Sequence, residues 1–216
     1  MPQPLFAEAA AEDFRRHLEK YDWSDQSPSR RQILQAFLRL ATTNGFQSVS
    51  MRMIAKVVNI KAPSIYAHFP DGRDEIVAES LRWHFHQFGT AVLDETDMCT
   101  SPADFWSAMV RVHLTRQLEL PESNLWDLLV ATDKMVHVLP AEVRDEAAEW
   151  VGLYEGMYNA VAQDLGIEEP YEGVRIVMTL LEGATRWCDW DGSEGQLAAL
   201  ADRAVQLTRS VLSLGR

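Results

Sequence analysis

The nine-residue stretch KAPSIYAHF, which begins at Lys61, combines an ammonium group, two hydroxyl groups and an imidazole without a carboxylate. Lys61 carries a positive charge, and Ser64, Tyr66 and His68 offer hydrogen bonds without adding negative charge. Side chains of these types bind the phosphate oxygens of nucleic acids. The chemistry that they predict is the non-covalent binding of a polyanion.

The charge around this stretch supports the same prediction. Between Ser27 and Pro70 the chain has six basic residues and no Asp or Glu, although its net charge is −12. The remaining 14 of its 20 Lys and Arg residues stand against all 32 acidic residues. A charge difference of this size favours an anionic partner for the basic segment, and the acidic remainder argues against unspecific nucleic-acid binding by the whole protein. The alternative is a helical stretch that lacks acids by chance. The six basic residues are Arg30, Arg31, Arg39, Arg52, Lys56 and Lys61.

Helices must position these side chains. Apolar residues recur at helical spacing along the chain, and Val, Ile and Thr form no short alternating runs, so we expect an all-α fold. We expect Ser29 to cap a helix that ends at Gly45, and Ser48 or Ser50 to cap the next one. Pro63 falls in the first turn of a further short helix, where a missing N–H has no cost. The expected helices are 4–21, 29–44, 50–57, 61–67, 73–93, 102–118, 123–137, 141–165, 171–188 and 194–214.

The two short helices at 50–57 and 61–67, braced by the helix before them, form the pattern of a helix-turn-helix unit. The second helix of such a motif lies in the major groove of DNA, where helix N-termini and hydroxyl groups hold the phosphates. In this chain that helix begins at Lys61, and Ala62 and Pro63 are small or apolar enough to touch a thymine methyl group. A carboxylate on this face would repel the DNA backbone, which explains why none is present.

The segment from about residue 28 to residue 83 resembles the DNA-binding domain of TetR-family transcriptional regulators. The matching elements keep fixed spacing over the whole segment. They are Ile33-Leu34, Ala36, Asn44-Gly45-Phe46, Ser50, Ile54-Ala55, Ser64-Ile65-Tyr66, His68-Phe69 and Glu75-Ile76. The sequence departs from the family at Asn59, where Gly is usual, at Lys61, where Ser is usual, and at the additional Gly72 before Arg73.

The resemblance implies a homodimer with an N-terminal DNA-binding domain and a larger helical domain that binds a small effector and dimerises. Most members of the family are repressors. The residues that the resemblance assigns to DNA are Ser50 and Arg52 on the second helix of the domain, Lys61, Ala62, Pro63 and Ser64 near the bases, and Tyr66, His68 and Arg73 at the phosphates.

The last two expected helices each carry an apolar stripe at spacings of three and four residues, which is typical of helix bundles. Two such helices from each of two subunits would form a four-helix seam, since Gly183 and Ala184 permit close approach. The two-fold symmetry of that seam predicts a palindromic operator with half-sites about 34 Å apart or a multiple of it. The alternative is that both stripes face only the core of their own subunit. The expected interface residues are Val177, Leu180, Ala184, Leu200, Ala204, Leu207 and Val211.

Aromatic residues gather in the part of the chain after residue 100. Converging aromatic side chains with a few polar tips are typical of a ligand cavity, and Met suits an adaptable wall. We therefore expect a pocket for an apolar or aromatic effector, although ordinary core is the commoner explanation for each of these residues on its own. The expected pocket residues are Trp106, Met109, His113, Trp126, Trp150, Tyr154 and Trp187.

Other chemistries lack residues at suitable spacing. His84 and His86 are two positions apart on a helix and point in different directions, so they make a poor metal pair. Cys99 and Cys188 form neither a disulfide framework nor a zinc pattern, which fits a reduced, cytoplasmic setting. We expect no signal peptide, membrane span, metal or cofactor. Paired carboxylates and a nucleophile with its base are also lacking, so we do not expect an enzyme.

The expected domains are an extension helix over 1–26, a helix-turn-helix domain over 27–87 with its motif at about 50–69, and a ligand-binding and dimerisation domain over 88–216. The predicted function is a homodimeric repressor that binds a palindromic operator and is released by a small effector. The alternatives are a helical interaction protein whose DNA-binding domain no longer functions, and an enzyme of the C-terminal helical domain. We expect the extension helix to pack either on the DNA-binding domain or on the partner subunit.

Overall fold

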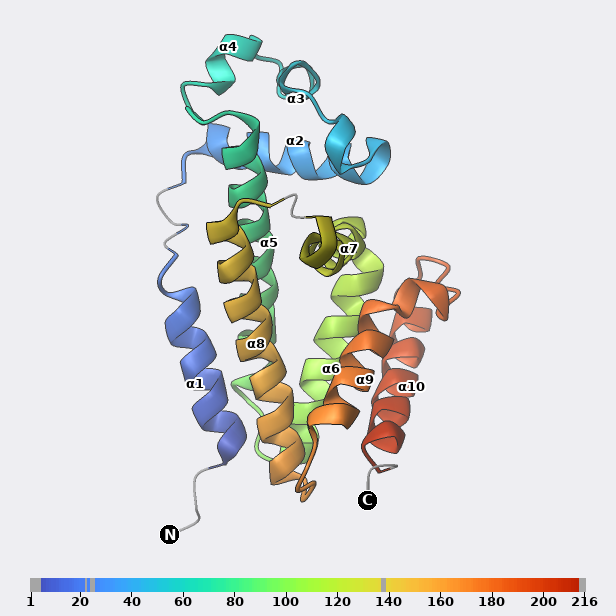
Figure 1. Cartoon of the computed structure of the whole chain (residues 1–216). Helices are drawn as coiled ribbons and strands as arrows, with labels where there is room; N and C mark the ends of the chain where they lie inside the picture. Colours follow the sequence, from blue (N-terminus) through green and yellow to red (C-terminus); the bar gives the residue numbers. More distant parts are fainter. Residues whose placement is uncertain (1–4, 22, 24–25, 137–138, 214–216) are drawn as a thin grey trace. The chain divides into compact units, whose positions relative to one another are not determined.

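A computed structural model describes residues 5–21, 23, 26–136 and 139–213, and none of these residues forms a strand. Ten α-helices and two short 3₁₀ helices make up their regular structure, so the predicted all-α fold is confirmed (Figure 1). Most predicted helix ends lie within a few residues of the observed ones. The ends predicted at positions 137 and 214 lie outside the described residues.

The chain divides into two compact units that do not follow the sequence order. We call the first the large unit and the second the small unit, and describe each by itself. The large unit is Met1–Lys20, Gln87–Leu120 and Ala148–Arg216, and the small unit is Tyr21–His86 and Pro121–Ala147. In this division the extension helix lies in the large unit, and residues 121–147 lie in the small unit.

The small unit contains the three helices that the sequence pattern singled out. Its helices are α2 (Pro28–Asn44), η1 (Phe46–Ser48), α3 (Met51–Val57), α4 (Ala62–Ile65) and α7 (Pro121–Val136), with the first parts of α5 (Arg73–Thr96) and α8 (Ala141–Asp164). In Figure 1, α3 and α4 lie on the same side of α2.

The ends of α2 are set by local chemistry. The cap is Ser27 and not Ser29 as predicted: the Ser27 hydroxyl accepts from the Arg30 N–H at 3.3 Å, and Pro28 occupies the first helical position. At the other end Gly45 has a φ of 82°, a left-handed conformation that glycine adopts without strain. The helix therefore stops where the sequence predicted.

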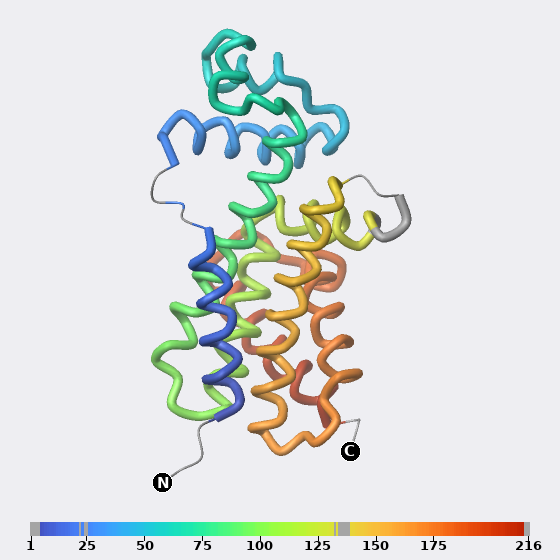
Figure 2. The backbone as a smooth tube through the Cα atoms, turned by 60° about the vertical axis from the view of Figure 1, so that its left-hand side comes forward, coloured from blue at the N-terminus to red at the C-terminus, as the bar shows by residue number. Residues whose placement is uncertain are grey.

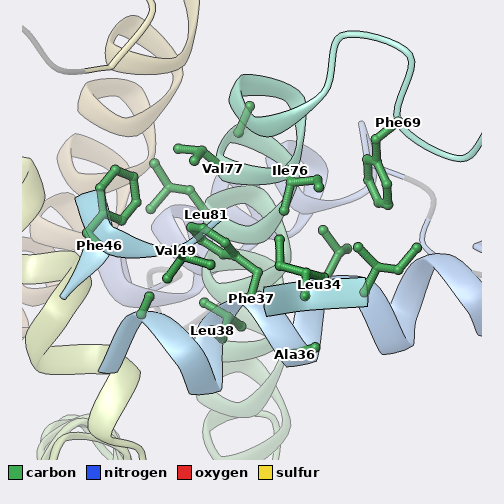
Figure 3. Packing of buried hydrophobic residues seen from close by; sticks show 14 of the residues in the cluster. Leu34, Ala36, Phe37, Leu38, Phe46, Val49, Phe69, Ile76, Val77 and Leu81 are labelled. Carbon is green, nitrogen blue, oxygen red and sulfur yellow. The ribbon is translucent and has the colours of Figure 1, made fainter. Parts of the chain in front are cut away.

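The core of the small unit is a continuous apolar cluster between α2, α3 and α5 (Figure 3). Phe37, Leu34 and Ile76 are almost completely buried in it. Helix α7 joins the same cluster, because Trp126 packs edge to face against Phe46 with ring centroids 5.9 Å apart. This contact explains why residues 121–147 belong to the small unit.

The large unit is a bundle of antiparallel and crossing helices, which Figure 2 shows from the side. Helices α6, α9 and α10 pack against one another. The helices of this unit are α1 (Phe6–Leu18), α6 (Pro102–Glu119), α9 (Tyr171–Glu182), η2 (Ala184–Arg186) and α10 (Glu194–Ser213), with the ends of α5 and α8.

The predicted continuous helix over 171–188 is wrong, since α9 ends at Glu182 and a 3₁₀ turn follows. The indole N–H of Trp187 donates to the Leu180 carbonyl at 2.8 Å. That carbonyl is thus satisfied by a side chain where a continuing helix would have used a backbone N–H. A Cβ at Gly183, the residue after the helix, would lie 3.1 Å from the Thr179 carbonyl oxygen.

The extension helix α1 packs within the large unit, against α5 and α8 (Figures 1 and 2). A Cβ on Gly89 of α5 would lie 2.8 Å from Leu18 Cδ1 and 3.0 Å from Phe14 Cζ, so the glycine lets the two helices approach closely. The Asp164 carboxylate of α8 accepts from the backbone N–H groups of Phe6 and Ala7 at 3.1 and 2.9 Å. This carboxylate supplies the cap that Leu5, the residue before the helix, does not provide.

Candidate nucleic-acid interface and aromatic cluster

Helices α3 and α4 form a compact helix-turn-helix motif. Ser50 caps α3, its hydroxyl accepting from the Met53 N–H at 3.3 Å. The turn closes through a hydrogen bond from the Ile60 N–H to the Ala55 carbonyl at 3.0 Å. Asn59 has a φ of 56°, a left-handed conformation in which Asn is the commonest substitute for glycine. The departure from the family's usual glycine at this position therefore keeps the turn.

The motif exposes the side chains that the sequence assigned to DNA. Arg52, Lys61, Pro63, Ser64 and Tyr66 are exposed, and the neighbouring Ala62 and His68 are partly buried. The apolar partners Ile54, Ile65 and Phe69 point into the core and are fully buried. The polar and apolar residues of the stretch thus separate onto two faces, as expected for a surface that meets a ligand.

Tyr66 is held in place by the additional glycine. A Cβ at Gly72 would lie 3.2 Å from Tyr66 Cε1, and Gly72 has a φ of 71°. The ring therefore rests against the turn after α4 while the side chain remains 50% exposed. This contact restricts the Tyr66 ring, which lowers the entropy cost of any further contact that its hydroxyl group makes.

The six basic residues between Ser27 and Pro70, a segment that we call the basic window, fall into two classes. Arg39, Arg52, Lys56 and Lys61 are exposed. Arg30 and Arg31 instead use their guanidinium groups inside the fold, Arg30 donating to the His68 carbonyl and Arg31 to the Trp23 carbonyl at 3.3 Å. Four of the six cations therefore remain available to a polyanion, a distinction that composition cannot make.

Arg73, which the resemblance placed at a phosphate, also faces inward. Its guanidinium donates to the Phe46 carbonyl at 2.7 Å and to the Val49 carbonyl at 3.3 Å. The group lies 5.1 Å from the centre of the Phe46 ring. Arg73 thus fastens the loop before α3 to the start of α5, and only part of its side chain is exposed.

Most of the expected pocket residues converge in the large unit. Trp106, Met109, His113, Trp150 and Tyr154 are buried there. The Trp106 ring packs edge to face on Tyr158 at 5.3 Å, and its indole N–H donates to the Thr208 hydroxyl at 3.1 Å. The aromatic cluster is the name that we give to Trp106, Met109, His113, Trp150 and Tyr154 together with Phe14, Phe88 and Tyr158.

Three members of the aromatic cluster were not among the predicted pocket residues. Phe88 packs edge to face against His113, Trp150 and Tyr154, with centroid distances between 5.2 and 5.6 Å. Phe14 reaches Trp150 and Tyr154 from α1. Phe14 lies on the buried face of α1 with Ala11 and Leu18, and the sequence did not indicate which partner that face would meet.

Two predicted pocket residues lie elsewhere. Trp126 belongs to the core of the small unit, so it is not part of the aromatic cluster. Trp187 is half-buried, and its N–H is bonded to the end of α9. Trp126 and Trp187 occupy positions in the helical pattern that resemble those of the cluster residues. Periodicity alone therefore placed them in the same predicted pocket.

The polar atoms of the aromatic cluster are neutral and buried. The Tyr154 hydroxyl lies 3.4 Å from His113 Nδ1 and 3.5 Å from the Tyr158 hydroxyl. Loss of hydration lowers the pKa of His113 to about 3. The same cause raises the pKa of Tyr154 and that of Tyr158. A charged group is therefore strongly disfavoured in this part of the large unit.

The expected dimer residues divide between the core and the surface. Val177, Ala184 and Ala204 are fully buried within their own subunit. Leu180, Leu200 and Val211 are partly exposed, and Leu207 is 36% exposed. Ile176 on α9, which the sequence pattern did not select, is 50% exposed. Part of each stripe thus faces inward, and an apolar outer face remains on α9 and α10.

Other site types find no support in the part of the chain that the structure describes. It contains no group of three or more His, Cys, Asp or Glu residues able to hold a metal ion. No described helix is long and apolar enough to cross a membrane. Cys99 is partly exposed and Cys188 buried, and each is a free thiol.

Similar proteins match the fold and the motif. Residues 33–79 match the family model described as bacterial regulatory proteins, tetR family. The chain is 27% identical over 132 residues to the HTH-type transcriptional regulator LmrA of Bacillus subtilis (strain 168), covering 59% of this chain and 69% of that protein.

Solved structures extend the similarity to the whole fold. A bacterial regulatory protein of the tetR family from Rhodococcus RHA1 has a TM-score of 0.73 and 13% identity, covering 87% of this chain and 98% of that one. AibR, solved with isovaleryl coenzyme A and operator DNA, has a TM-score of 0.63 and 19% identity, covering 82% of this chain and 96% of that one. Both support one architecture, a helix-turn-helix region followed by further helices.

Proposed function

We propose that this chain is a transcriptional regulator of the TetR family, a homodimeric repressor that binds a palindromic DNA operator and is released by a small effector. The observation that carries the DNA-binding part is the exposed face of α3 and α4, where cations and hydroxyl groups stand without a carboxylate. A repressor of this kind acts in the cytoplasm, where it meets the chromosome.

On this proposal Arg52 and Lys61 neutralise phosphates, and Tyr66 and His68 donate hydrogen bonds to phosphate oxygens. Ala62, Pro63 and Ser64 lie where base edges would be read in the major groove. Ser50 remains a candidate contact, because its oxygen caps α3 while its exposed hydroxyl still has a proton to donate. Arg73 acts indirectly, by holding the loop before α3.

The test uses duplexes that the wild-type protein enriches from a random-sequence DNA library. We expect Lys61→Ala to weaken binding and to reduce the slope of log K against log salt by about 0.9, the loss of one phosphate contact. Tyr66→Phe removes only a hydroxyl and is expected to lower affinity without changing that slope. If both variants keep the wild-type affinity and slope, these contacts are wrongly assigned. If the wild-type protein enriches no duplex at all, the chain is instead a helical interaction protein whose DNA-binding domain has lost its function.

The dimer is proposed to form through the outer face of α9 and α10. In a protein rich in charged residues, the apolar Ile176 and Leu207 are exposed and Leu180 is partly exposed. An apolar helix face of this kind is stabilised when it packs against the same face of a second copy, related to the first by a two-fold axis. Val177, Ala184 and Ala204 support this face from below, and Leu200 and Val211 extend it.

Sedimentation velocity tests the dimer. We expect Leu207→Arg to shift the protein from dimer to monomer at micromolar concentration, because the interface would bury an unpaired charge. Met98→Arg is the control, since Met98 is exposed in the large unit but lies outside this face. A wild-type monomer, or an unchanged Leu207→Arg dimer, contradicts the proposed interface.

The effector is proposed to bind in the aromatic cluster and to be uncharged. Its neutral His113 and its two tyrosines would supply hydrogen bonds, and the rings around them would supply apolar contact. The ligand would stabilise a conformation in which α5 moves the recognition helices out of register, a coupling of about 1–3 kcal/mol. AibR, which shares the fold, was solved with isovaleryl coenzyme A, a ligand whose acyl group is apolar but whose coenzyme part is charged.

A thermal-shift comparison of phenol, indole and benzoate tests the expected charge preference. Phenol and benzoate are similar in size, but only benzoate carries a charge that the aromatic cluster would have to desolvate. We expect phenol or indole to raise the melting temperature and benzoate not to. Stabilisation by benzoate alone would show that the site provides a cation and that the neutral cluster is not the binding site.

A further inference from the structure

Arg30 lies in the basic window but does not face outward. Its guanidinium donates to the carbonyl of His68 and stacks on the Phe69 ring, with its central carbon 4.1 Å from the ring centre. His68 and Phe69 lie three and four residues after the last residue of the recognition helix α4, which spans only Ala62–Ile65. Because one helical turn cannot hold itself in place, its end depends on contacts of this kind.

Two carboxylates of α5 bind the same guanidinium. Glu75 Oε1 lies 3.5 Å from Arg30 Nη1, and Glu79 Oε2 lies 3.6 Å from Arg30 Nη2. The other oxygen of Glu79 accepts from Arg82 Nη1 at 2.9 Å. Glu79 therefore stands between two arginines, one on α2 and one a turn further along α5.

The chain of ion pairs ends on α8. Arg82 donates from Nε and Nη2 to the two oxygens of Glu146, at 2.7 and 2.8 Å. This fork-to-fork geometry fixes the relative orientation of the two side chains, and all members of the chain are less than 25% exposed. Glu146 lies one turn before Trp150 of the aromatic cluster on the same helix.

We infer that Arg30, Glu79, Arg82 and Glu146 form an ionic relay that ties the end of the recognition helix to α8, with Arg30 positioning the helix for DNA. This inference rests on the proposed DNA-binding function. A half-buried ion pair that loses one partner leaves the other charge without compensation. Movements that keep the four side chains paired therefore cost less free energy than movements that separate them. A shift of α8 at Glu146 would therefore reach the carbonyl of His68 through side chains that are in contact at every step.

The relay differs from two simpler roles that Arg30 could have. A phosphate contact would contribute to the salt dependence of DNA binding, by about 0.9 in slope for each contact. A purely stabilising residue would change the melting temperature but not the preference of the folded protein for its own sequence. A positioning residue changes that preference while leaving the salt slope unchanged.

The experiment measures affinity for a duplex selected by the wild-type protein and for an unrelated duplex of equal length. The variants are Arg30→Met, which keeps a long side chain over Phe69, Glu146→Gln, which is nearly isosteric, and both together. Arg111→Met is the matched control: it removes the same charge and breaks an arginine–carboxylate pair between α6 and α10, with Asp202. All measurements are made well below the melting temperature of each variant.

We expect Arg30→Met to lower the ratio of selected to unrelated affinity by about tenfold, within the range of known couplings between sites. Its salt slope is expected to equal that of the wild-type protein, and Arg111→Met to leave the ratio unchanged. Glu146→Gln is expected to lower the ratio by a smaller factor, and to have no further effect when Arg30 is already Met.

Two results would overturn the inference while leaving DNA binding by α3 and α4 intact. If the effects of Arg30→Met and Glu146→Gln simply multiply, no relay joins them. If Arg30→Met reduces the salt slope by about one, Arg30 is a phosphate contact. Should Arg30→Met fail to fold, Glu79→Gln and Glu146→Gln form an equivalent pair, because Glu79 does not touch Phe69. Failure of the proposed function itself appears differently, as the absence of any duplex that the wild-type protein prefers.

Discussion

The exposed face of α3 and α4 and the aromatic cluster of the large unit treat polar groups in opposite ways. On α3 and α4, Arg52 and Lys61 keep their charges in water. In the cluster, His113, Tyr154 and Tyr158 are buried and held neutral. A solvent-exposed charge attracts a charged ligand before contact but adds little to the free energy of unfolding. A packed ring contributes to that free energy only through the atoms it touches. Substitutions in the two regions should therefore change different measurable quantities.

The largest difference is expected for Trp106→Ala. The Trp106 side chain is fully buried, with its N–H bonded to Thr208, so its removal leaves a cavity and takes away the donor that the Thr208 oxygen accepts from. We expect a loss of about 3–5 kcal/mol in the free energy of unfolding, measured by denaturant titration. Tyr66→Ala, which removes a half-exposed ring from the exposed face of α3 and α4, should change it by less than about 0.5 kcal/mol. A loss below about 1 kcal/mol for Trp106→Ala would mean that the cluster already contains open space.

A second prediction separates the two kinds of arginine in the small unit. Arg73→Gln leaves the Phe46 and Val49 carbonyls without their charged donor, and should cost about 1.5–3 kcal/mol of stability. Arg52→Gln should cost less than about 0.5 kcal/mol but reduce the salt slope of DNA binding by about 0.9. Denaturation and binding of both variants are measured side by side. The opposite outcome, a lower slope for Arg73→Gln, would restore Arg73 as a phosphate contact.

A third prediction concerns the packing of α1 beside the aromatic cluster. Gly89→Ala places a methyl group against the buried side chains of Phe14 and Leu18, and should cost about 1–3 kcal/mol. Gly152→Ala is the matched control, since a Cβ at this helical glycine meets nothing within 4 Å. It should stabilise the protein by about 0.5–1 kcal/mol through the loss of chain entropy in the unfolded state. Equal effects of the two substitutions would show that α1 does not pack closely on α5.

The sequence predicted the fold class and the helix-turn-helix motif because both depend on local patterns. Ser50, Gly45 and Pro63 act through their own backbone neighbourhood, so their roles were readable in advance. The separation of the stretch after Lys61 into an exposed polar face and a buried apolar face follows from helical periodicity in the same way. The assignment of this stretch to DNA remains a proposal.

The remaining features depend on contacts between segments far apart in the sequence. Trp126 and Trp150 both lie on amphipathic helices, and only the packing partners Phe46 and Phe88 place them in different units. Arg30 and Arg52 look alike in the sequence, yet one is bonded to the carbonyl of His68 and the other is exposed. Periodicity predicts that a side chain is buried or exposed, but not which distant group it meets. That is why the number of basic residues counted in the basic window exceeds the number that the folded chain exposes.

The smallest effect is expected from protonation of His113, and it tests the neutral character of the aromatic cluster. Burial lowers the pKa of His113 to about 3, whereas in the unfolded chain the group titrates near its ordinary value of about 6.5. Between these values the unfolded state binds a proton that the folded state refuses, so stability falls as the pH falls. From pH 7.5 to 5.5 this should remove about 1.4 kcal/mol from the free energy of unfolding. His113→Gln should lose that part of the pH dependence, while Phe88→Leu, which alters a neighbouring ring, should lower the whole curve and keep its slope. Parallel curves for the wild-type protein and His113→Gln would show that the imidazole can take up a proton in the folded state, and the cluster would then accept a charged effector as readily as a neutral one.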